Sequence, residues 1–133
     1  MKILFVCKYN RFRSKIAEAL LRLYCKDRNL KIESAGIERD FMHPNVPESV
    51  NQVVAEMGAK VVSQDSQQVE PTLTDWADKI VIVADDVSND DFPEEKVERW
   101  EVKDGNEYDI ESIRRGARKI DKKVKDLVKR LNE

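Results

Sequence analysis

Residues 2–20, KILFVCKYNRFRSKIAEAL, decide the fold because an apolar run, a basic loop and an apolar-periodic segment follow one another. The run KILFVC at residues 2–7 is short and almost wholly apolar, which is typical of a strand buried in a parallel sheet. From Ser14 to about Lys26, apolar side chains recur at helical spacing. The stretch therefore predicts a strand, a tight loop and a helix, with Cys7 at the carboxyl end of the strand.

The rest of the chain continues this alternation of strands and helices. The further elements that we expect are strands at residues 30–36, 80–84 and 96–102, a helical turn at 76–78, and helices at 50–57 and 110–131. The last helix is the clearest, because its apolar residues step by three and four, and Asp109 is its expected N-cap. The order predicts an α/β fold, a three-layer sandwich in which a four-stranded, mostly parallel sheet carries helices on both faces.

Length and composition limit the class of protein. The 133 residues suit a single domain over residues 1–133, and a formal net charge of −2 gives no general attraction to nucleic acid or membrane. No run approaches the roughly 18 apolar residues that span a bilayer, and the start lacks the features of a signal peptide. We therefore expect a cytoplasmic protein with two free thiols, Cys7 and Cys25, and with neither nucleic acid nor membrane as a partner.

Metal chemistry has little support in the sequence. The single histidine, His43, lies in a proline-containing loop, and the two cysteines are far apart, so no recognised ligand spacing is present. Four aspartates follow the third expected strand, at positions 85, 86, 90 and 91. We interpret them as a solvated acidic loop rather than as a cation site, and we expect no metal.

The loop between the first strand and the first helix carries the candidate site. Ligands of open parallel sheets bind beyond the carboxyl ends of the strands, which is where Cys7 lies. Backbone N–H groups of such a loop, with those of the helix start, form an anion-binding nest. Arg13 can bind two oxygens of a tetrahedral oxyanion through its forked guanidinium. Asn10 suits a left-handed turn, and Ser14 is placed to cap the helix or to donate to the Cys7 sulfur.

The same surroundings favour an ionised sulfur at Cys7. A helix amino terminus and nearby basic side chains stabilise a thiolate, so we expect Cys7 to be largely ionised at neutral pH. A thiolate beside an oxyanion cradle is a nucleophile aimed at phosphorus, and the cradle would stabilise charge on the transferring phosphoryl oxygens. The alternative is a buried structural cysteine followed by a solvated basic loop.

These residues resemble the low-molecular-weight protein tyrosine phosphatases and the related thioredoxin-type arsenate reductases, which carry Cys-x-Gly-Asn-x-Cys-Arg-Ser after their first strand. Cys7, Asn10, Arg13 and Ser14 match this motif. The segments IAEAL, ESAG and VKDG resemble further family segments in the same order. The resemblance covers nearly the whole chain and implies a four-stranded parallel sheet flanked by helices, with no metal and no organic cofactor.

The resemblance also implies a mechanism. Cys7 attacks the phosphoryl group and forms a phosphocysteine, Arg13 binds that group, and Asp104 first protonates the leaving oxygen and then activates water. Other members of the phosphate-binding loop are Lys8, Tyr9, Asn10, Arg11, Phe12 and Ser14. Phe41 and Tyr108 are candidate pocket walls. The implied partners are a phosphorylated protein or small aryl phosphate, and inorganic phosphate or a similar oxyanion. Asp104 also fits an ordinary Asp-Gly turn.

Several positions depart from the family pattern and leave two alternatives to a phosphatase. Tyr9 replaces a loop glycine, Phe12 replaces the second cysteine, and Gly105 replaces the proline after the acid. One alternative is an arsenate reductase that uses an external thiol, because residues 84–96 contain no cysteine for an internal relay. The other is a phosphate-binding regulatory module without turnover, which the changes at positions 9 and 105 motivate.

Overall fold

A parallel four-stranded sheet forms the centre of the computed structural model, which describes all residues from 1 to 133. Its strands are β1 (Lys2–Cys7), β2 (Lys31–Gly36), β3 (Lys79–Val83) and β4 (Val97–Trp100). They lie in the order β2-β1-β3-β4, and every neighbouring pair is parallel. The prediction of a four-stranded, mostly parallel sheet is therefore confirmed. The observed β3 lies one residue earlier than expected, and β4 is shorter at both ends.

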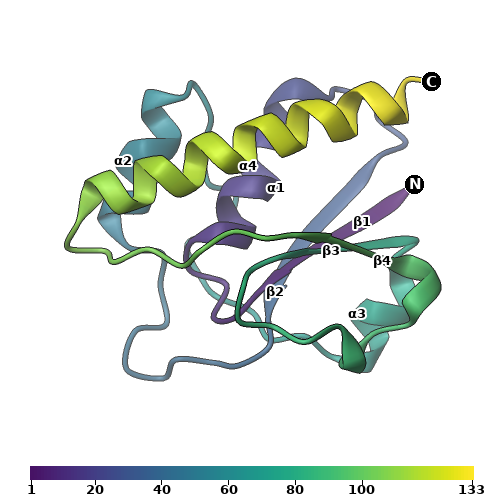
Figure 1. Cartoon of the computed structure of the whole chain (residues 1–133), viewed down its shortest axis with the longest axis horizontal. Coiled ribbons are helices and arrows are strands. Elements are labelled where there is room, and N and C mark those ends of the chain that lie inside the picture. The colour runs from purple at the N-terminus through teal and green to yellow at the C-terminus, as the bar shows by residue number, and fades with distance from the viewer.

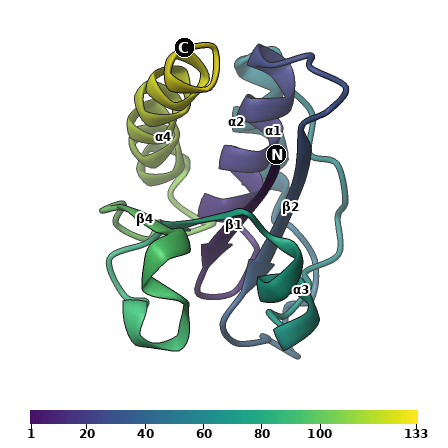
Figure 2. The ribbon, with the colours of Figure 1, turned by 90° about the vertical axis from the view of Figure 1, so that its right-hand side faces the viewer.

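Helices cover both faces of the sheet, as predicted, but unequally (Figures 1 and 2). One face carries the three longer helices, α1 (Arg13–Tyr24), α2 (Glu48–Glu56) and α4 (Ile110–Leu131). The other carries α3 (Pro71–Trp76) and the 3-10 turns η1 (Asn89–Asp91) and η2 (Glu94–Lys96). The first turn of α3 accommodates proline because the N–H groups there have no helical acceptor. None of the helices has the length and apolar character needed to cross a membrane.

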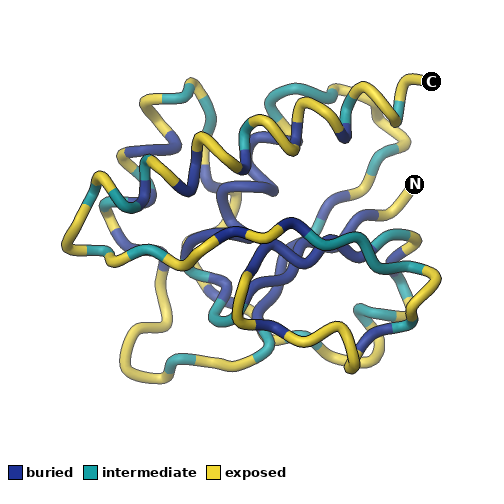
Figure 3. The backbone as a smooth tube through the Cα atoms, in the orientation of Figure 1, coloured by how far each residue is buried: buried dark blue, intermediate teal, exposed yellow.

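The central strands are largely buried (Figure 3), and their side chains alternate between two hydrophobic clusters. Ile3 and Phe5 of β1 pack into the larger cluster beneath α1, α2 and α4, whereas Leu4 and Val6 pack into the smaller one beside α3. Each of these four side chains is fully buried. Since both faces are covered, a continuous apolar run is the pattern that such a strand needs.

Helix α1 is buried along its first nine residues, between the sheet and α4. This stretch includes four polar side chains, namely Arg13, Ser14, Lys15 and Glu18. Buried polar groups require hydrogen-bond partners. The amino-terminal half of α1 is therefore built as much by polar contacts as by hydrophobic packing.

The start of α4 differs from the sequence prediction in one detail. Asp109 occupies the N-cap position, but its side chain makes no capping hydrogen bond. The Ser112 hydroxyl instead accepts the Asn106 N–H at 3.0 Å and donates to the Asp109 carbonyl at 2.6 Å. Ser112 thus ties the first turn of α4 to the loop before it, a contact that residue type alone does not reveal.

We expect Glu98 of β4 to make the stability of the fold depend on pH in the acid range. Its carboxylate accepts hydrogen bonds from Arg130 of α4 at 2.7 and 2.8 Å and from Lys79 at 2.9 Å. Chiefly because of the Arg130 contacts, the pKa of Glu98 falls from 4.5 to about 2. A carboxyl group whose pKa is lower in the folded state stabilises the fold above its unfolded pKa and loses that effect as pH falls toward its folded pKa.

Glu98→Gln should therefore lower the unfolding temperature at neutral pH, and its difference from the unmodified protein should shrink between pH 4.5 and about 2. Thermal unfolding followed by circular dichroism measures this. Glu95→Gln, at an exposed site without a hydrogen-bond partner, is the matched control. A difference that stays constant with pH would contradict the assignment.

Candidate active site

The loop that joins β1 to α1 curls around one residue in a left-handed conformation. Asn10 has φ 56° and is the only non-glycine residue with positive φ, which confirms the expectation for this position. Its side-chain amide donates to Ser14 Oγ at 2.8 Å and to Ser34 Oγ at 3.0 Å. Its side-chain oxygen accepts the Gln67 N–H at 2.9 Å. The loop is thus fastened from inside to three other segments.

Gly36, at the end of β2, lets the loop approach the sheet. A Cβ atom there would lie 2.7 Å from the backbone carbon of Tyr9 and 2.8 Å from the backbone nitrogen of Asn10. Real Cβ atoms essentially never come this close to backbone, so only glycine fits. The sequence marked Gly36 only as the end of a strand, since nothing local shows that another loop crosses it.

Cys7 ends β1 with its sulfur directed at the start of α1. Its Sγ lies 2.9 Å from Ser14 Oγ. Ser14 Oγ already accepts a hydrogen bond from Asn10, which leaves the hydroxyl proton free to point at the sulfur. This contact confirms one of the two roles expected for Ser14. The other is wrong, because Phe12 is the N-cap residue of α1 and no side chain caps it.

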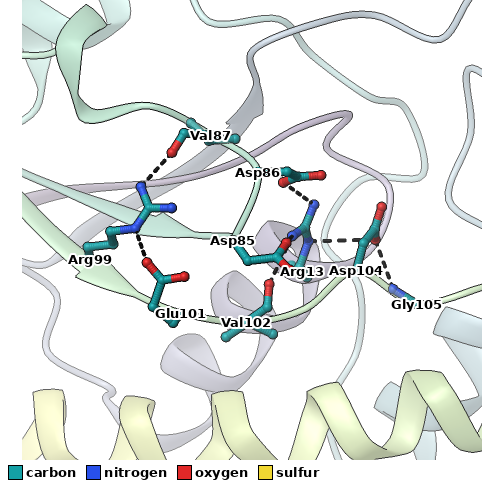
Figure 4. Close-up of polar contacts among 9 residues, drawn as sticks. All are labelled: Arg13, Asp85, Asp86, Val87, Arg99, Glu101, Val102, Asp104 and Gly105. Atoms are coloured by element: carbon teal, nitrogen blue, oxygen red, sulfur yellow. Dashed lines mark hydrogen bonds and ion pairs between the residues drawn. The ribbon is translucent and has the colours of Figure 1, made fainter.

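Arg13 lies at the base of the site with its guanidinium surrounded by acceptors (Figure 4). Nη1 donates to the Val102 carbonyl at 2.9 Å and to Asp85 at 3.2 Å, and Nη2 donates to Asp86 at 3.0 Å. Nε is buried and has no hydrogen-bond acceptor, although Asp104 Oδ1 lies 3.6 Å away. One donor of the fork therefore remains available to a ligand.

The four aspartates are exposed to solvent, as expected, but two of them also contact the site. Asp85 and Asp86 are partly exposed, but each makes an ion pair with Arg13, whereas Asp90 and Asp91 are exposed without such a pair. The first two follow the carboxyl end of β3, which lies beside β1 in the sheet. That adjacency brings them to the loop, and it could have been inferred once the strand order was known.

Asp104 stands at the edge of the site, where its carboxylate reaches both the pocket and Arg13. Its side chain is 44% exposed, and its Oδ1 accepts the Gly105 N–H at 3.0 Å. It lines the same pocket as Cys7. A carboxyl group in this place can exchange a proton with a ligand whose phosphoryl group rests on the loop.

A pocket of about 350 Å³ opens above the loop and collects most of the predicted site residues. Those that line it are Cys7, Tyr9, Arg11, Phe12, Arg13, Asp104 and Tyr108. Asn10 and Ser14 are fully buried and do not line the pocket. Lys8 and Phe41 are not among the lining residues: the Lys8 ammonium lies over the Tyr9 ring, 5.4 Å from its centre, and Phe41 is 81% exposed.

Phe12 contributes its backbone to the loop and its ring to the core. The residue is 6% exposed and belongs to the larger hydrophobic cluster. Its ring lies against Gly116 of α4, where an added Cβ would be 2.7 Å from Cζ, and against Gly105, where it would be 3.1 Å from Cε2. The side chain therefore anchors the loop to α4 and to the segment that carries Asp104.

Arg11 connects two loops at the mouth of the pocket. Its Nε donates to the Asn45 carbonyl at 2.9 Å, and its Nη2 lies 3.5 Å from Glu107. His43, in the same loop as Asn45, instead pairs with Asp40 at 3.1 Å and does not line the pocket. No group of three or more His, Cys, Asp and Glu side chains is placed to hold a metal ion.

The family model described as low molecular weight phosphotyrosine protein phosphatase matches residues 2–133. The chain belongs to this family. Members of the low-molecular-weight phosphatase family act as phosphatases or as arsenate reductases. We refer to residues 7–14, where β1 passes into α1, as the phosphate-binding loop, after the role expected for them from the sequence.

Relatives within the low-molecular-weight phosphatase family include both activities. An arsenate reductase from Bacillus cereus is 28% identical over 126 residues, covering 92% of this chain and 90% of its own length. The structure of an arsenate reductase from Archaeoglobus fulgidus is 33% identical with a TM-score of 0.74, covering 95% and 98% of the two chains. Vibrio vulnificus Wzb, solved in complex with benzylphosphonate, has a TM-score of 0.83 at 21% identity, covering 97% of each chain.

We expect Asn10 to be the least replaceable polar residue of the phosphate-binding loop. Asn10→Ala removes three buried hydrogen bonds and places a Cβ-bearing residue without compensating contacts in a left-handed conformation. Each buried partner that is left without a hydrogen bond lowers the free energy of unfolding by about 1–3 kcal/mol. Asn10→Gly removes the same bonds but tolerates the conformation.

The order of unfolding free energy should therefore be unmodified protein, then Asn10→Gly, then Asn10→Ala, with about 1 kcal/mol between the two variants. Urea unfolding measures the order. Equal stability of the two variants would show that the left-handed backbone costs nothing, and stability equal to the unmodified protein would show that the hydrogen bonds contribute nothing.

Proposed function

We propose that this protein is a phosphatase that hydrolyses phosphotyrosine or a similar aryl phosphate monoester through a phosphocysteine. The observation that carries the proposal is the buried Nε of Arg13, which has no acceptor and belongs to a residue that lines the same pocket as Cys7 and Asp104. An unsatisfied buried donor is costly unless a ligand completes it. An oxyanion bound above Cys7 would accept from this nitrogen.

The reaction would proceed in two displacements at phosphorus. Binding of the phosphoryl group requires Arg13 to direct Nε and Nη2 at two of its oxygens, and Nη2 would leave Asp86 to do so. The Cys7 thiolate then forms a sulfur–phosphorus bond as the bond to the aryl oxygen breaks, and Asp104 protonates that oxygen. Water attacks the phosphocysteine, Asp104 takes its proton, and phosphate leaves with the thiolate restored.

The pocket favours an aryl leaving group. Tyr9 and Tyr108 contribute aromatic rings to its lining, and Pro47, Val50 and Ile113 add apolar surface. Binding of benzylphosphonate by Vibrio vulnificus Wzb supports an aromatic ligand in this position. A phosphorylated protein or a small aryl phosphate would present such a ring, and inorganic phosphate would remain as the product ligand.

Arsenate reduction is the second candidate, because arsenate reductases occur among the relatives at 28% and 33% identity. Reduction would need a second thiol to attack a Cys7–arsenate adduct. Cys25 follows the carboxyl end of α1, whereas Cys7 contacts its start, and twelve helical residues span about 18 Å. A disulfide requires Cα atoms within about 7 Å, so the thiol would have to be external. A phosphate-binding regulatory module is the third candidate.

Hydrolysis of p-nitrophenyl phosphate separates these functions. The unmodified protein should release p-nitrophenol, and Cys7→Ser should abolish release because the nucleophile is lost. An inactive protein that still binds phosphate would favour the regulatory module. Oxidation of glutathione or a similar small thiol in the presence of arsenate, without hydrolysis of the aryl phosphate, would favour the reductase. Activity that persists in Cys7→Ser would refute the phosphocysteine.

Asp104→Asn should distinguish a general acid from a turn residue. Removal of a general acid lowers the rate about 100-fold or more where the leaving group needs a proton. We expect such a loss for an alkyl phosphate and a smaller one for p-nitrophenyl phosphate, whose leaving group is already stable. Asp90→Asn, at an exposed position in η1, is the control and should keep both rates. Equal losses on both substrates would contradict the assignment.

A further inference from the structure

Lys15 is a buried cation that the proposed reaction does not use. It lies in the first turn of α1, directly after Ser14, and the residue is only 3% exposed. Its Nζ donates to the carbonyls of Ser63 and Asp65, at 3.0 and 2.9 Å. Burying an ammonium is costly, and two carbonyl acceptors offset only part of that cost. Such a group usually persists because it organises its surroundings.

The segment held by Lys15 supports the back of the phosphate-binding loop. We call residues 63–67 the support segment. Within it, Ser66 Oγ donates to the Asn10 carbonyl at 3.0 Å, and the Gln67 N–H donates to the Asn10 side-chain oxygen at 2.9 Å. The Gln67 carbonyl accepts the Gly36 N–H at 2.8 Å. The support segment therefore fixes both the backbone and the side chain of the left-handed residue.

A continuous line of hydrogen bonds leads from the same region to the sulfur. Ser34 Oγ donates to Glu18 at 2.7 Å and accepts from the Asn10 amide, which also donates to Ser14. Ser14 in turn contacts Cys7. Lys15 makes no hydrogen bond to this line of groups, but it lines the same cavity as Glu18 and Ser34, which belong to that line.

The charges around Lys15 favour its ammonium form. Burial lowers the pKa of Lys15 below its ordinary value, and the nearby charges of Glu18, Cys7, Asp65 and Glu33 act in the opposite direction. The other cation that lines the same cavity is Arg22, which pairs with Glu18 at 3.3 Å. Because attraction between opposite charges is reciprocal, the Lys15 ammonium would in turn attract an ionised Cys7.

We propose that Lys15 is a positioning residue, whose ammonium fixes the support segment against the phosphate-binding loop and stabilises the ionised sulfur of Cys7 from behind. The role deepens the proposed function, because it assumes that the Cys7 sulfur is the reacting group. Lys15 lines a separate cavity of about 360 Å³ and is absent from the pocket above Cys7. It therefore acts on the reaction without touching the substrate.

Two measurements on the full chain test this role without turnover. In a Cys25→Ser background, iodoacetamide reacts with Cys7 alone, and its rate as a function of pH reports the thiolate. Protection of Cys7 by inorganic phosphate reports oxyanion affinity. Lys15→Met should move the midpoint of the pH profile upward by about one unit and weaken protection about tenfold. Lys122→Met, at an exposed position on α4, is the matched control.

Two further variants separate the effect of the Lys15 charge from the effect of a correctly placed support segment. Ser66→Ala removes the hydrogen bond to the Asn10 carbonyl but no charge, so it should weaken phosphate protection while leaving the pH midpoint in place. Lys15→Ala leaves room beside the cavity, so methylammonium in solution should partly return the midpoint to that of the unmodified protein, whereas the bulkier tetramethylammonium should not. A role that is only structural would not respond to a small cation.

The outcomes are decisive in both directions. An unchanged midpoint and unchanged protection in Lys15→Met would overturn the proposal, as would an unchanged affinity in Ser66→Ala. If Lys15→Met does not fold, as judged by circular dichroism, then Ser66→Ala and the methylammonium experiment decide. Neither readout needs hydrolysis, so an unmodified protein that fails to cleave p-nitrophenyl phosphate would refute the phosphatase and leave the role of Lys15 to be judged separately.

Discussion

The left-handed backbone at Asn10 is the constraint on which the rest of the site depends. A loop of five residues between a strand and a helix can converge on one point only if it reverses its curl, and an L-residue in that conformation needs local compensation. Three hydrogen bonds from the Asn10 side chain, to Ser14, Ser34 and Gln67, supply it. Each partner comes from a different element, so the loop takes its shape only when the sheet, α1 and the support segment are all in place.

Carboxylates outnumber the single guanidinium at the centre of the site. Arg13 faces Asp85, Asp86 and Asp104, which keeps a fully buried guanidinium compensated. An arriving oxyanion must therefore compete with carboxylates that are only partly buried and can return to water. Since the binding group is already positioned, little reorganisation of the protein accompanies binding, and the net gain depends on how readily Asp86 gives up Nη2.

The sequence was sufficient for the fold and for the centre of the site. A continuous apolar run, helical periodicity and the order of elements are local signals, and they predicted that Cys7, Asn10, Arg13 and Ser14 lie at the junction of a strand and a helix, where the structure has them. The sequence did not predict the roles that depend on contacts with residues far away in the chain. The partners of Asp85 and Asp86 depend on strand order, the fit of Gly36 on a crossing loop, and the burial of Lys15 on carbonyls some fifty residues away.

Phe12 has a consequence for how the molecule opens. Its ring lies in the main core against Gly116, and the residues that follow it are buried in α1, so the phosphate-binding loop cannot loosen without disturbing the packing of α4. Slow amide exchange should extend from β1 straight through this loop, as in a single cooperative unit. Phe41 and Met42 are largely exposed and lie outside that unit, so the part of the loop that carries them can fluctuate while the anion cradle stays rigid.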